Sequence, residues 1–248
     1  MIPAKSIQND RYIINNSIFE YLALAETQFH RNDTRTNIEP QQQNLFQFID
    51  NKEDRIKLIN IAQKYKGYNQ LDIYTDGSLK DVKTDDMRMA CAFIVKSPIE
   101  TTFSCAIENE PSSTKVELMA VILAIMICPK DSRININTDS KNIITIFEKL
   151  ITMEMSKIKK ERFTDLYLWS FLIRLIRFFN LTVTMTKVKA HSDDIYNNEA
   201  DKEAKLALQA NCLNFNQEIF QTVPQISWNE KILKTNFMKL NIWKNFLN

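Results

Sequence analysis

Residues 71–78 have the sequence LDIYTDGS, in which apolar and polar side chains alternate before the chain reaches an Asp-Gly pair. Alternation with a period of two is typical of a β-strand. We therefore predict a strand at residues 71–75, with Asp76 at its end. An Asp-Gly pair also favours an ordinary turn, which is a purely structural interpretation of Asp76 and Gly77.

The pattern of strands and helices continues downstream to residue 210. Strand-like runs occur at 89–96, 101–107, 133–138 and 181–188. Helical patterns occur at 116–127, 140–150, 164–179 and 197–210. The first two of these strands are expected to form a hairpin, and the order β-β-β-α-β-α-α-β-α predicts an α/β fold with a mixed five-stranded sheet covered by helices.

The flanking regions differ from this central part, so we divide the chain into three regions. Residues 1–70 predict helices and polar connections, including a helical stretch at 44–66 that Gly67 would end. Residues 71–210 form the predicted α/β domain. Residues 211–248 predict a short tail with an amphipathic helix at 229–247.

Composition excludes several classes of protein. Of the 248 residues, 44% are hydrophobic and 25% are charged, which is typical of a globular protein. The formal net charge of +2 argues against a strongly basic coat for nucleic acid. Only 2 glycines occur, and neither a dinucleotide-binding nor a P-loop glycine motif is present, which disfavours Rossmann enzymes, P-loop ATPases and kinases.

The sequence also favours an intracellular protein that does not enter a membrane. No apolar run reaches 18 residues, and the first residues lack the apolar segment of a secretory signal. Four cysteines occur without C-x-x-C spacing, so we expect reduced, packed thiols: Cys91, Cys105, Cys128 and Cys212.

Four acidic residues fall at the ends of the predicted elements. Asp76 and Asp139 each follow a strand, whereas Glu117 and Asp201 lie in the first turns of predicted helices. If the two strands are parallel neighbours, Asp76 and Asp139 meet at one edge of the sheet. Ligands of open α/β sheets bind beyond this carboxyl edge.

Each of these acids also has a purely structural interpretation. Thr114 and Glu117 have the spacing of a capping box, and Asp139 could be a helix N-cap. Asp201, three residues after Asn198, could support a helix start. These interpretations would place four unrelated acids at the same end of one sheet by coincidence.

A divalent cation explains the four acids together, because Mg²⁺ prefers oxygen ligands and clustered carboxylates repel one another without a cation. Two cations about 3.5–4 Å apart can clamp a phosphodiester, and this chemistry needs no nucleophilic Ser or Cys. A serine hydrolase is disfavoured because no G-x-S-x-G motif occurs. His191, in a polar loop after the last strand, would suit a proton carrier beside a metal-bound phosphate, although a loop histidine is usually only solvated.

The blocks YTDGS (74–78), KVELMA (115–120), NTDS (137–140) and His191 with NNEAD (197–201) together resemble type 1 ribonuclease H. Four blocks in the same order, with matching elements between them, cover residues 71–210. The resemblance implies a ribonuclease H-like fold and a metal-dependent endonuclease that hydrolyses the RNA strand of RNA–DNA hybrids with two Mg²⁺ ions, for which Mn²⁺ could substitute.

The resemblance also implies roles for individual residues. Asp76, Glu117, Asp139 and Asp201 fall on the metal-ligand positions, and His191 falls on a flexible-loop histidine that assists proton movement or product release. Positions that contact nucleic acid in the family correspond to Ser112, Ser113, Thr114, Ser140, Lys141 and Asn197. Hydroxyls could recognise the 2′-OH of RNA, and capping or turn formation is the plainer role of these residues.

The chain departs from the family where its second strand begins. The family usually has glycines there, whereas residues 81–86 of this chain are DVKTDD. A stand-alone enzyme and a fragment of a retroelement polyprotein both fit the sequence. Two other functions stay open: an inert module that binds nucleic acid or a partner, and another nuclease or transposase on the same fold. The oligomeric state is not determined by the sequence.

Overall fold

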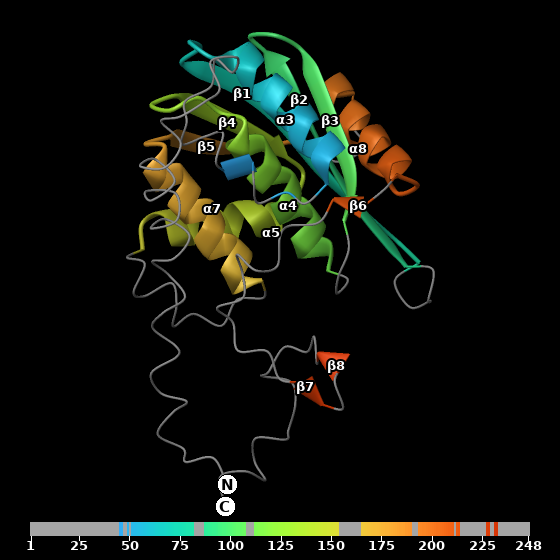
Figure 1. Ribbon diagram of the computed structural model, residues 1–248. Helices are drawn as coiled ribbons and strands as arrows, with labels where there is room; N and C mark the ends of the chain where they lie inside the picture. The colour runs from blue at the N-terminus through green and yellow to red at the C-terminus, as the bar shows by residue number, and fades with distance from the viewer. Residues whose placement is uncertain are drawn as a thin grey trace, which may run out of the picture.

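The computed structural model describes residues 45–46, 49, 51–81, 87–107, 112–153, 165–189, 193–210, 212–213, 227–228 and 231–232 (Figure 1). Its helices are α3 (Lys52–Tyr65), α4 (Ser113–Met126), α5 (Lys141–Ile151), α7 (Leu166–Phe178) and α8 (Ile195–Ala207). Its longer strands are β1 (Gln70–Lys80), β2 (Arg88–Ser97), β3 (Thr101–Ile107), β4 (Arg133–Thr138) and β5 (Thr182–Lys187). Three strands of two residues each are β6 (Cys212–Leu213), β7 (Ser227–Trp228) and β8 (Lys231–Ile232).

The main sheet has the strand order β5-β4-β1-β2-β3-β6. β1, β2 and β3 are antiparallel neighbours, whereas β4 is parallel to both β1 and β5. The mixed five-stranded sheet and the antiparallel opening predicted from the sequence are therefore confirmed. The structure adds β6, which pairs with β3 in parallel at the edge of the sheet.

Helices cover both faces of the sheet (Figure 1). α4 packs on β1 and β2 and contacts α5 and α7, and these helices share one hydrophobic core with α3. Eleven residues of α4 are buried, so the helix is apolar around most of its circumference and lies in the centre of this layer. On the other face, α8 packs across β1, β2 and β3.

Alternation along β1 separates the two faces. Leu71 and Ile73 belong to the core beneath α4, whereas Tyr74 joins Ile94 and Ala200 beneath α8. The strand does not end at Thr75 as predicted, but continues to Lys80. The Asp-Gly pair is therefore not a turn. The other glycine does end a helix as predicted: Gly67 follows α3 with a φ of +87°.

The predicted elements of residues 1–44 lie outside the described residues, as does most of the tail. At the described tail positions, β7 and β8 form a two-stranded antiparallel ladder. Lys231 and Ile232 are thus in a strand, where the sequence predicts the helix 229–247. The division into regions 1–70, 71–210 and 211–248 stays a prediction.

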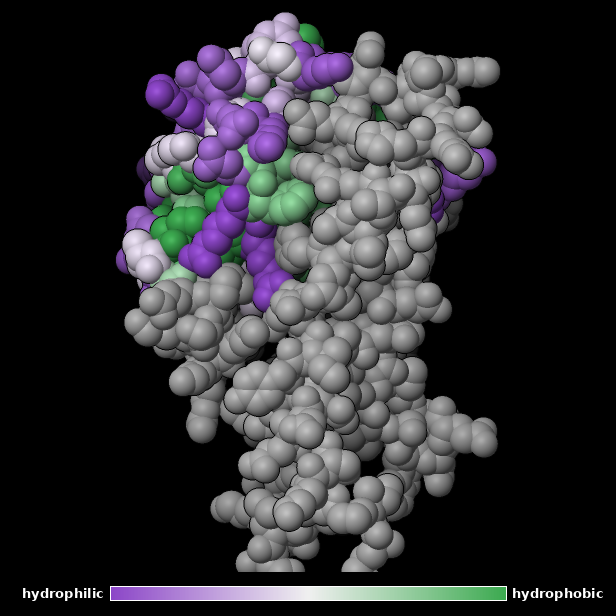
Figure 2. Space-filling model, turned by 60° about the vertical axis from the view of Figure 1, so that its left-hand side comes forward, coloured by the Kyte–Doolittle hydropathy of each residue, from purple (hydrophilic) through white to green (hydrophobic). Residues whose placement is uncertain are grey.

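One face of the described residues combines hydrophilic and hydrophobic side chains (Figure 2). On the face shown in Figure 2, hydrophilic residues surround a smaller hydrophobic area. Within the described ranges, no helix has the length and the apolar character that crossing a membrane would require.

Candidate metal centre

The register of the sheet brings Asp76 and Asp139 to one edge. β1 pairs with β4 from Gln70–Arg133 to Tyr74–Asn137, and both chains then leave this ladder. Asp76 lies two residues beyond the last pair, and Asp139 directly follows β4. Because the strands are parallel, both carboxylates lie beyond the carboxyl end of the same ladder, as predicted from the sequence.

A close approach of α4 to β1 adds Glu117. The α4 helix begins after Ser112, whose hydroxyl accepts a hydrogen bond from Lys115 N at 3.2 Å. Glu117 therefore lies in the second turn rather than the predicted first turn. Gly77 faces this part of α4, and a Cβ atom at Gly77 would lie 2.7 Å from Glu117 N and from Val116 C. Only glycine allows the helix backbone to come so near to the strand.

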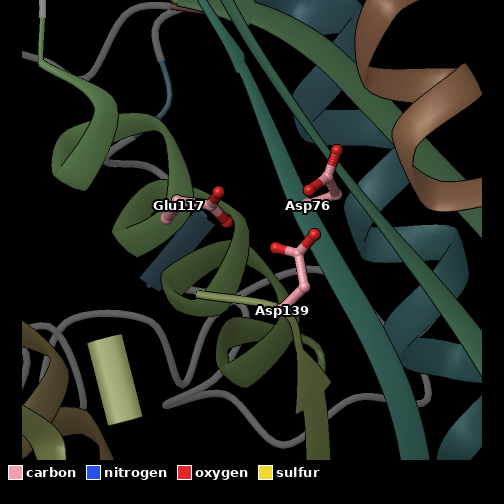
Figure 3. Close-up of side chains that lie close together, drawn as sticks. All are labelled: Asp76, Glu117 and Asp139. Atoms are coloured by element: carbon pink, nitrogen blue, oxygen red, sulfur yellow. The ribbon is translucent and has the colours of Figure 1, made fainter. Parts of the chain in front are cut away.

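The three carboxylates point toward one another (Figure 3). One oxygen from each of Asp76, Glu117 and Asp139 lies within 4.8 Å of the others. Asp76 is 6% exposed, and Oε2 of Glu117 is buried without a hydrogen-bond partner in the structure. The site thus combines convergent oxygen ligands with an unsatisfied buried acceptor, which is the donor set that Mg²⁺ or Mn²⁺ prefers.

Burial and mutual repulsion raise the pKa values of the central acids. Burial, followed by the charges of Asp139 and Asp201, raises the pKa of Asp76 to about 7. Burial is also the largest cause that raises the pKa of Glu117, and the charges of Asp76 and Asp139 add to it. The Gly77 backbone N–H and Lys187 partly oppose this rise at Glu117. A divalent cation would remove the repulsion directly.

Asp201 lies outside this trio. The α8 helix begins after Asp194, so Asp201 is in its second turn and not in its first turn as predicted. Its Oδ2 accepts a hydrogen bond from Lys205 Nζ at 2.6 Å, and its side chain is 32% exposed. The charge of Asp201 nevertheless contributes to the raised pKa of Asp76, so the fourth acid interacts electrostatically with the site.

The structural interpretations of the four acids do not hold for the described residues. Ser112 caps α4, so Thr114 and Glu117 are not a capping box. Ser140, and not Asp139, occupies the N-cap position of α5. Asp194 caps α8, so neither Asn198 nor Asp201 is needed there. Helix capping therefore does not explain these acids.

The residues predicted to contact nucleic acid have varied environments. Ser113 and Lys141 are exposed at the starts of α4 and α5, and Asn142 joins these starts by donating to the Thr114 hydroxyl at 3.0 Å. Ser112 and Ser140 are N-cap residues. Asn197 is 3% exposed. His191 lies outside the described residues.

Sequence reasoning missed one positively charged side chain at the site. Lys187 is the last residue of β5, and its ammonium group donates to the backbone carbonyls of Asp139 and Val188. It therefore holds the segment that presents Asp139. If the strand order β5-β4-β1 were known, it would place the carboxyl end of β5 beside Asp139. That order is a tertiary property, which the sequence alone does not reveal.

Comparisons with known proteins identify the family. The family model described as RNase H matches residues 68–209. Ribonuclease H of Acetivibrio thermocellus is 26% identical over 147 residues, which cover 57% of this chain and 97% of that protein. Ribonuclease H of Chlorobaculum parvum is 27% identical over 107 residues, which cover 40% of this chain and 72% of that protein.

Two solved structures are also similar. LC9-RNase H1, a type 1 RNase H with the type 2 active-site motif, has a TM-score of 0.46 and 15% identity, and the match covers 63% of this chain and 82% of that one. A foamy viral protease-reverse transcriptase in complex with dsDNA has a TM-score of 0.45 and 18% identity, covering 57% and 95%. Because the family model matches more than half of its residues, the chain belongs to the RNase H family.

Proposed function

We propose that this protein hydrolyses the RNA strand of RNA–DNA hybrids and that two divalent cations, Mg²⁺ or Mn²⁺, support the reaction. The observation that carries the proposal is the trio Asp76, Glu117 and Asp139, whose oxygens lie within 4.8 Å of one another in a chain of the RNase H family. Its inward-facing carboxylates, half or more buried, are suited to cation binding and are costly without it.

Different side chains are proposed to bind the cations and the substrate. Asp76, Glu117 and Asp139 would hold one cation, and Asp201 would complete the set for a second. Bound there, such cations would activate water and stabilise the charge on the oxygen that leaves the phosphodiester. Lys187 keeps the Asp139 backbone in place. His191 is proposed to move a proton or to assist product release.

The hybrid is proposed to lie across the starts of α4 and α5. Ser113 and Lys141 are exposed there, and the Asn142–Thr114 hydrogen bond fixes the two helix starts relative to each other. Hydroxyl groups distinguish RNA by its 2′-OH, and lysine neutralises phosphate. Ser112, Ser140 and Asn197 complete the proposed contact set.

A cleavage assay tests this proposal. Labelled RNA–DNA hybrid, double-stranded RNA and double-stranded DNA would each be incubated with the full chain and Mg²⁺, with and without chelator. We expect cleavage of the RNA strand of the hybrid alone, and none in chelator. Equal cleavage of double-stranded DNA would indicate another nuclease of this fold, and binding without cleavage would indicate an inert module.

The pKa of Asp76 predicts how pH affects stability. Its carboxyl group has an ordinary pKa of 3.8, and about 7 in the folded protein. Between these values the folded state keeps a proton that the unfolded state has lost, so the metal-free protein should lose stability as pH rises from about 4 to about 7. Metal ligands must be deprotonated, so saturating Mn²⁺ should raise Tm more at pH 8 than at pH 5.5.

Thermal unfolding at both pH values, with Mn²⁺ and with chelator, measures this difference. An equal rise in Tm at both pH values would contradict the assignment of Asp76 as a ligand.

A further inference from the structure

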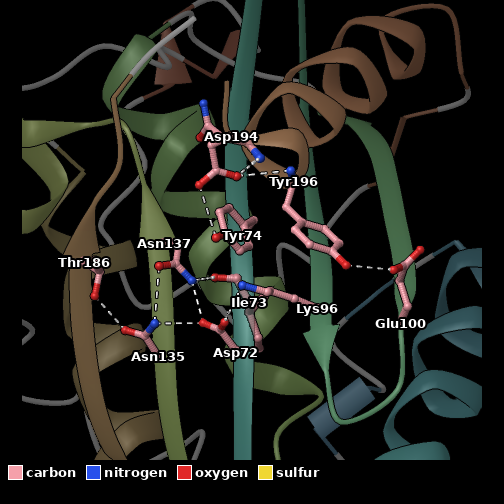
Figure 4. A network of polar contacts seen from close by, with 11 residues as sticks. Asp72, Ile73, Tyr74, Lys96, Glu100, Asn135, Asn137, Thr186, Asp194 and Tyr196 are labelled. Carbon is pink, nitrogen blue, oxygen red and sulfur yellow. Dashed lines mark hydrogen bonds and ion pairs between the residues drawn. The ribbon is translucent and has the colours of Figure 1, made fainter. Parts of the chain in front are cut away.

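A buried tyrosine joins β1 to the start of α8. Tyr74 is 6% exposed and lies two residues before Asp76, so both side chains are on the same face of the strand. Its hydroxyl donates to Oδ2 of Asp194 at 3.3 Å (Figure 4).

The same aspartate holds the first turn of α8. Oδ1 of Asp194 accepts hydrogen bonds from Tyr196 N and Asn197 N, each at 3.1 Å. One oxygen of the carboxylate thus caps the helix while the other receives the Tyr74 hydroxyl. The helix start is thereby tied to the middle of β1.

Aromatic and charged neighbours surround this contact. The Tyr74 and Tyr196 rings lie 5.5 Å apart, and Lys96 Nζ lies within 6 Å of both ring centroids. Lys96 also pairs with Asp72 at 3.7 Å (Figure 4). On the outer side, the Tyr196 hydroxyl donates to Glu100 Oε2 at 3.2 Å. The two tyrosines therefore make similar hydrogen bonds, but only that of Tyr74 joins β1 to the helix cap.

The same two elements, β1 and α8, also hold Asp76 of the trio and the fourth acid, Asp201. Asp76 lies two residues after Tyr74, about 7 Å along the strand. Asp201 lies seven residues after Asp194, two turns and about 10 Å along the same side of α8. A shift of α8 at the Tyr74–Asp194 contact would therefore change the distance between Asp201 and Asp76.

We propose that Tyr74 and Asp194 are a positioning pair that sets Asp201 at the distance from Asp76 needed to complete the second cation site. This inference rests on the proposed function, because it assigns Asp201 to a cation. In this proposal, neither residue binds the substrate or a cation. Their contact acts through α8, and the trio, whose members come from β1, α4 and the end of β4, does not depend on it.

The experiment compares two variants that each remove one tyrosine hydroxyl. Calorimetric titration of the metal-free full chain with Mn²⁺ measures both cation sites, and Tm measures stability. Tyr74→Phe should weaken the weaker site by about threefold to tenfold, the range that one lost hydrogen bond allows, and leave the tighter site unchanged. Tyr196→Phe, the matched control, should leave both affinities unchanged.

Two substitutions of Asp194 provide an independent test with equal loss of charge. Asp194→Ser keeps a capping hydroxyl but is too short to reach Tyr74, so it should weaken the second site as Tyr74→Phe does. Asp194→Asn keeps the cap and retains an amide that can bond to the Tyr74 hydroxyl, so it should bind Mn²⁺ nearly as the wild type does. With Tyr74→Phe, excess Mn²⁺ should restore hybrid cleavage.

Three results would overturn the inference: equal effects in the two tyrosine variants, a lower Tm for Tyr74→Phe with unchanged Mn²⁺ affinities, or equal effects of Asp194→Ser and Asp194→Asn. Absence of Mn²⁺ binding in the wild-type protein would instead contradict the proposed metal centre itself. If Tyr74→Phe does not fold, the comparison of the two Asp194 variants decides the question.

Discussion

Replacing Asp76 with Asn is expected to lower hybrid cleavage by more than about 100-fold while making the metal-free protein more stable at pH 8. Residues that merely orient metal ligands typically contribute about 10–100-fold to affinity or activity, so a ligand itself should contribute more. The gain in stability follows from the pKa of about 7, because an uncharged Asn does not repel Asp139 and Asp201.

Single-turnover cleavage with Mg²⁺ measures the effect on activity, and Tm in chelator measures the effect on stability. Asp131→Asn is the matched control, since Asp131 precedes β4 at the opposite end of that strand and Asn keeps the oxygen that accepts from Asn180 Nδ2. The control should retain activity. A loss of Tm in Asp76→Asn would show that the carboxylate stabilises the fold, and retained cleavage would remove Asp76 from the site.

Replacing Gly77 with Ala should damage the fold and the site together. The added Cβ would lie 2.7 Å from Glu117 N, Val116 C and Val116 Cγ2, and two of these are backbone atoms that cannot rotate away. Overpacking of this kind typically costs about 1–3 kcal/mol, and α4 must move to relieve it. Because Glu117 moves with α4, we expect near-complete loss of cleavage and weaker Mn²⁺ binding.

The chain offers a matched control in Gly67, its other glycine. A Cβ there meets nothing within 4 Å, but φ is +87°, so Gly67→Ala should cost stability through backbone strain alone and leave cleavage intact. The double variant Gly77→Ala, Val116→Ala removes the one side-chain contact, and it should not recover activity. Full activity of Gly77→Ala would show that the close approach of α4 is not required.

The sequence predicted the order of elements well because the strands and helices have clear apolar periods. It misplaced the end of β1 because an Asp-Gly pair usually indicates a turn. Here tertiary contacts explain both residues. Asp76 belongs to the acid cluster, and Gly77 leaves room for the backbone of α4. Neither partner lies near them in the sequence, so no local pattern could reveal the cause.

Helix starts were predicted less accurately than helix interiors, for a different reason. Ser112, Ser113 and Thr114 are all acceptable caps, and local propensity does not choose among them. Asp194 was overlooked as a cap because the predicted helix began at Asn197. Glu117, the helical member of the trio, could still be named from the sequence, since a helix that begins one turn earlier keeps this side chain on nearly the same face.

Asp76 lies in the interior of an eleven-residue strand rather than in a loop. Its two companions likewise come from a buried helix and from the first residue after a strand. The conformational entropy that a loop would lose on gathering ligands is, in this molecule, already lost when the chain folds. An arriving cation therefore needs to shed water and displace protons, and it does not have to wait for the chain to become ordered.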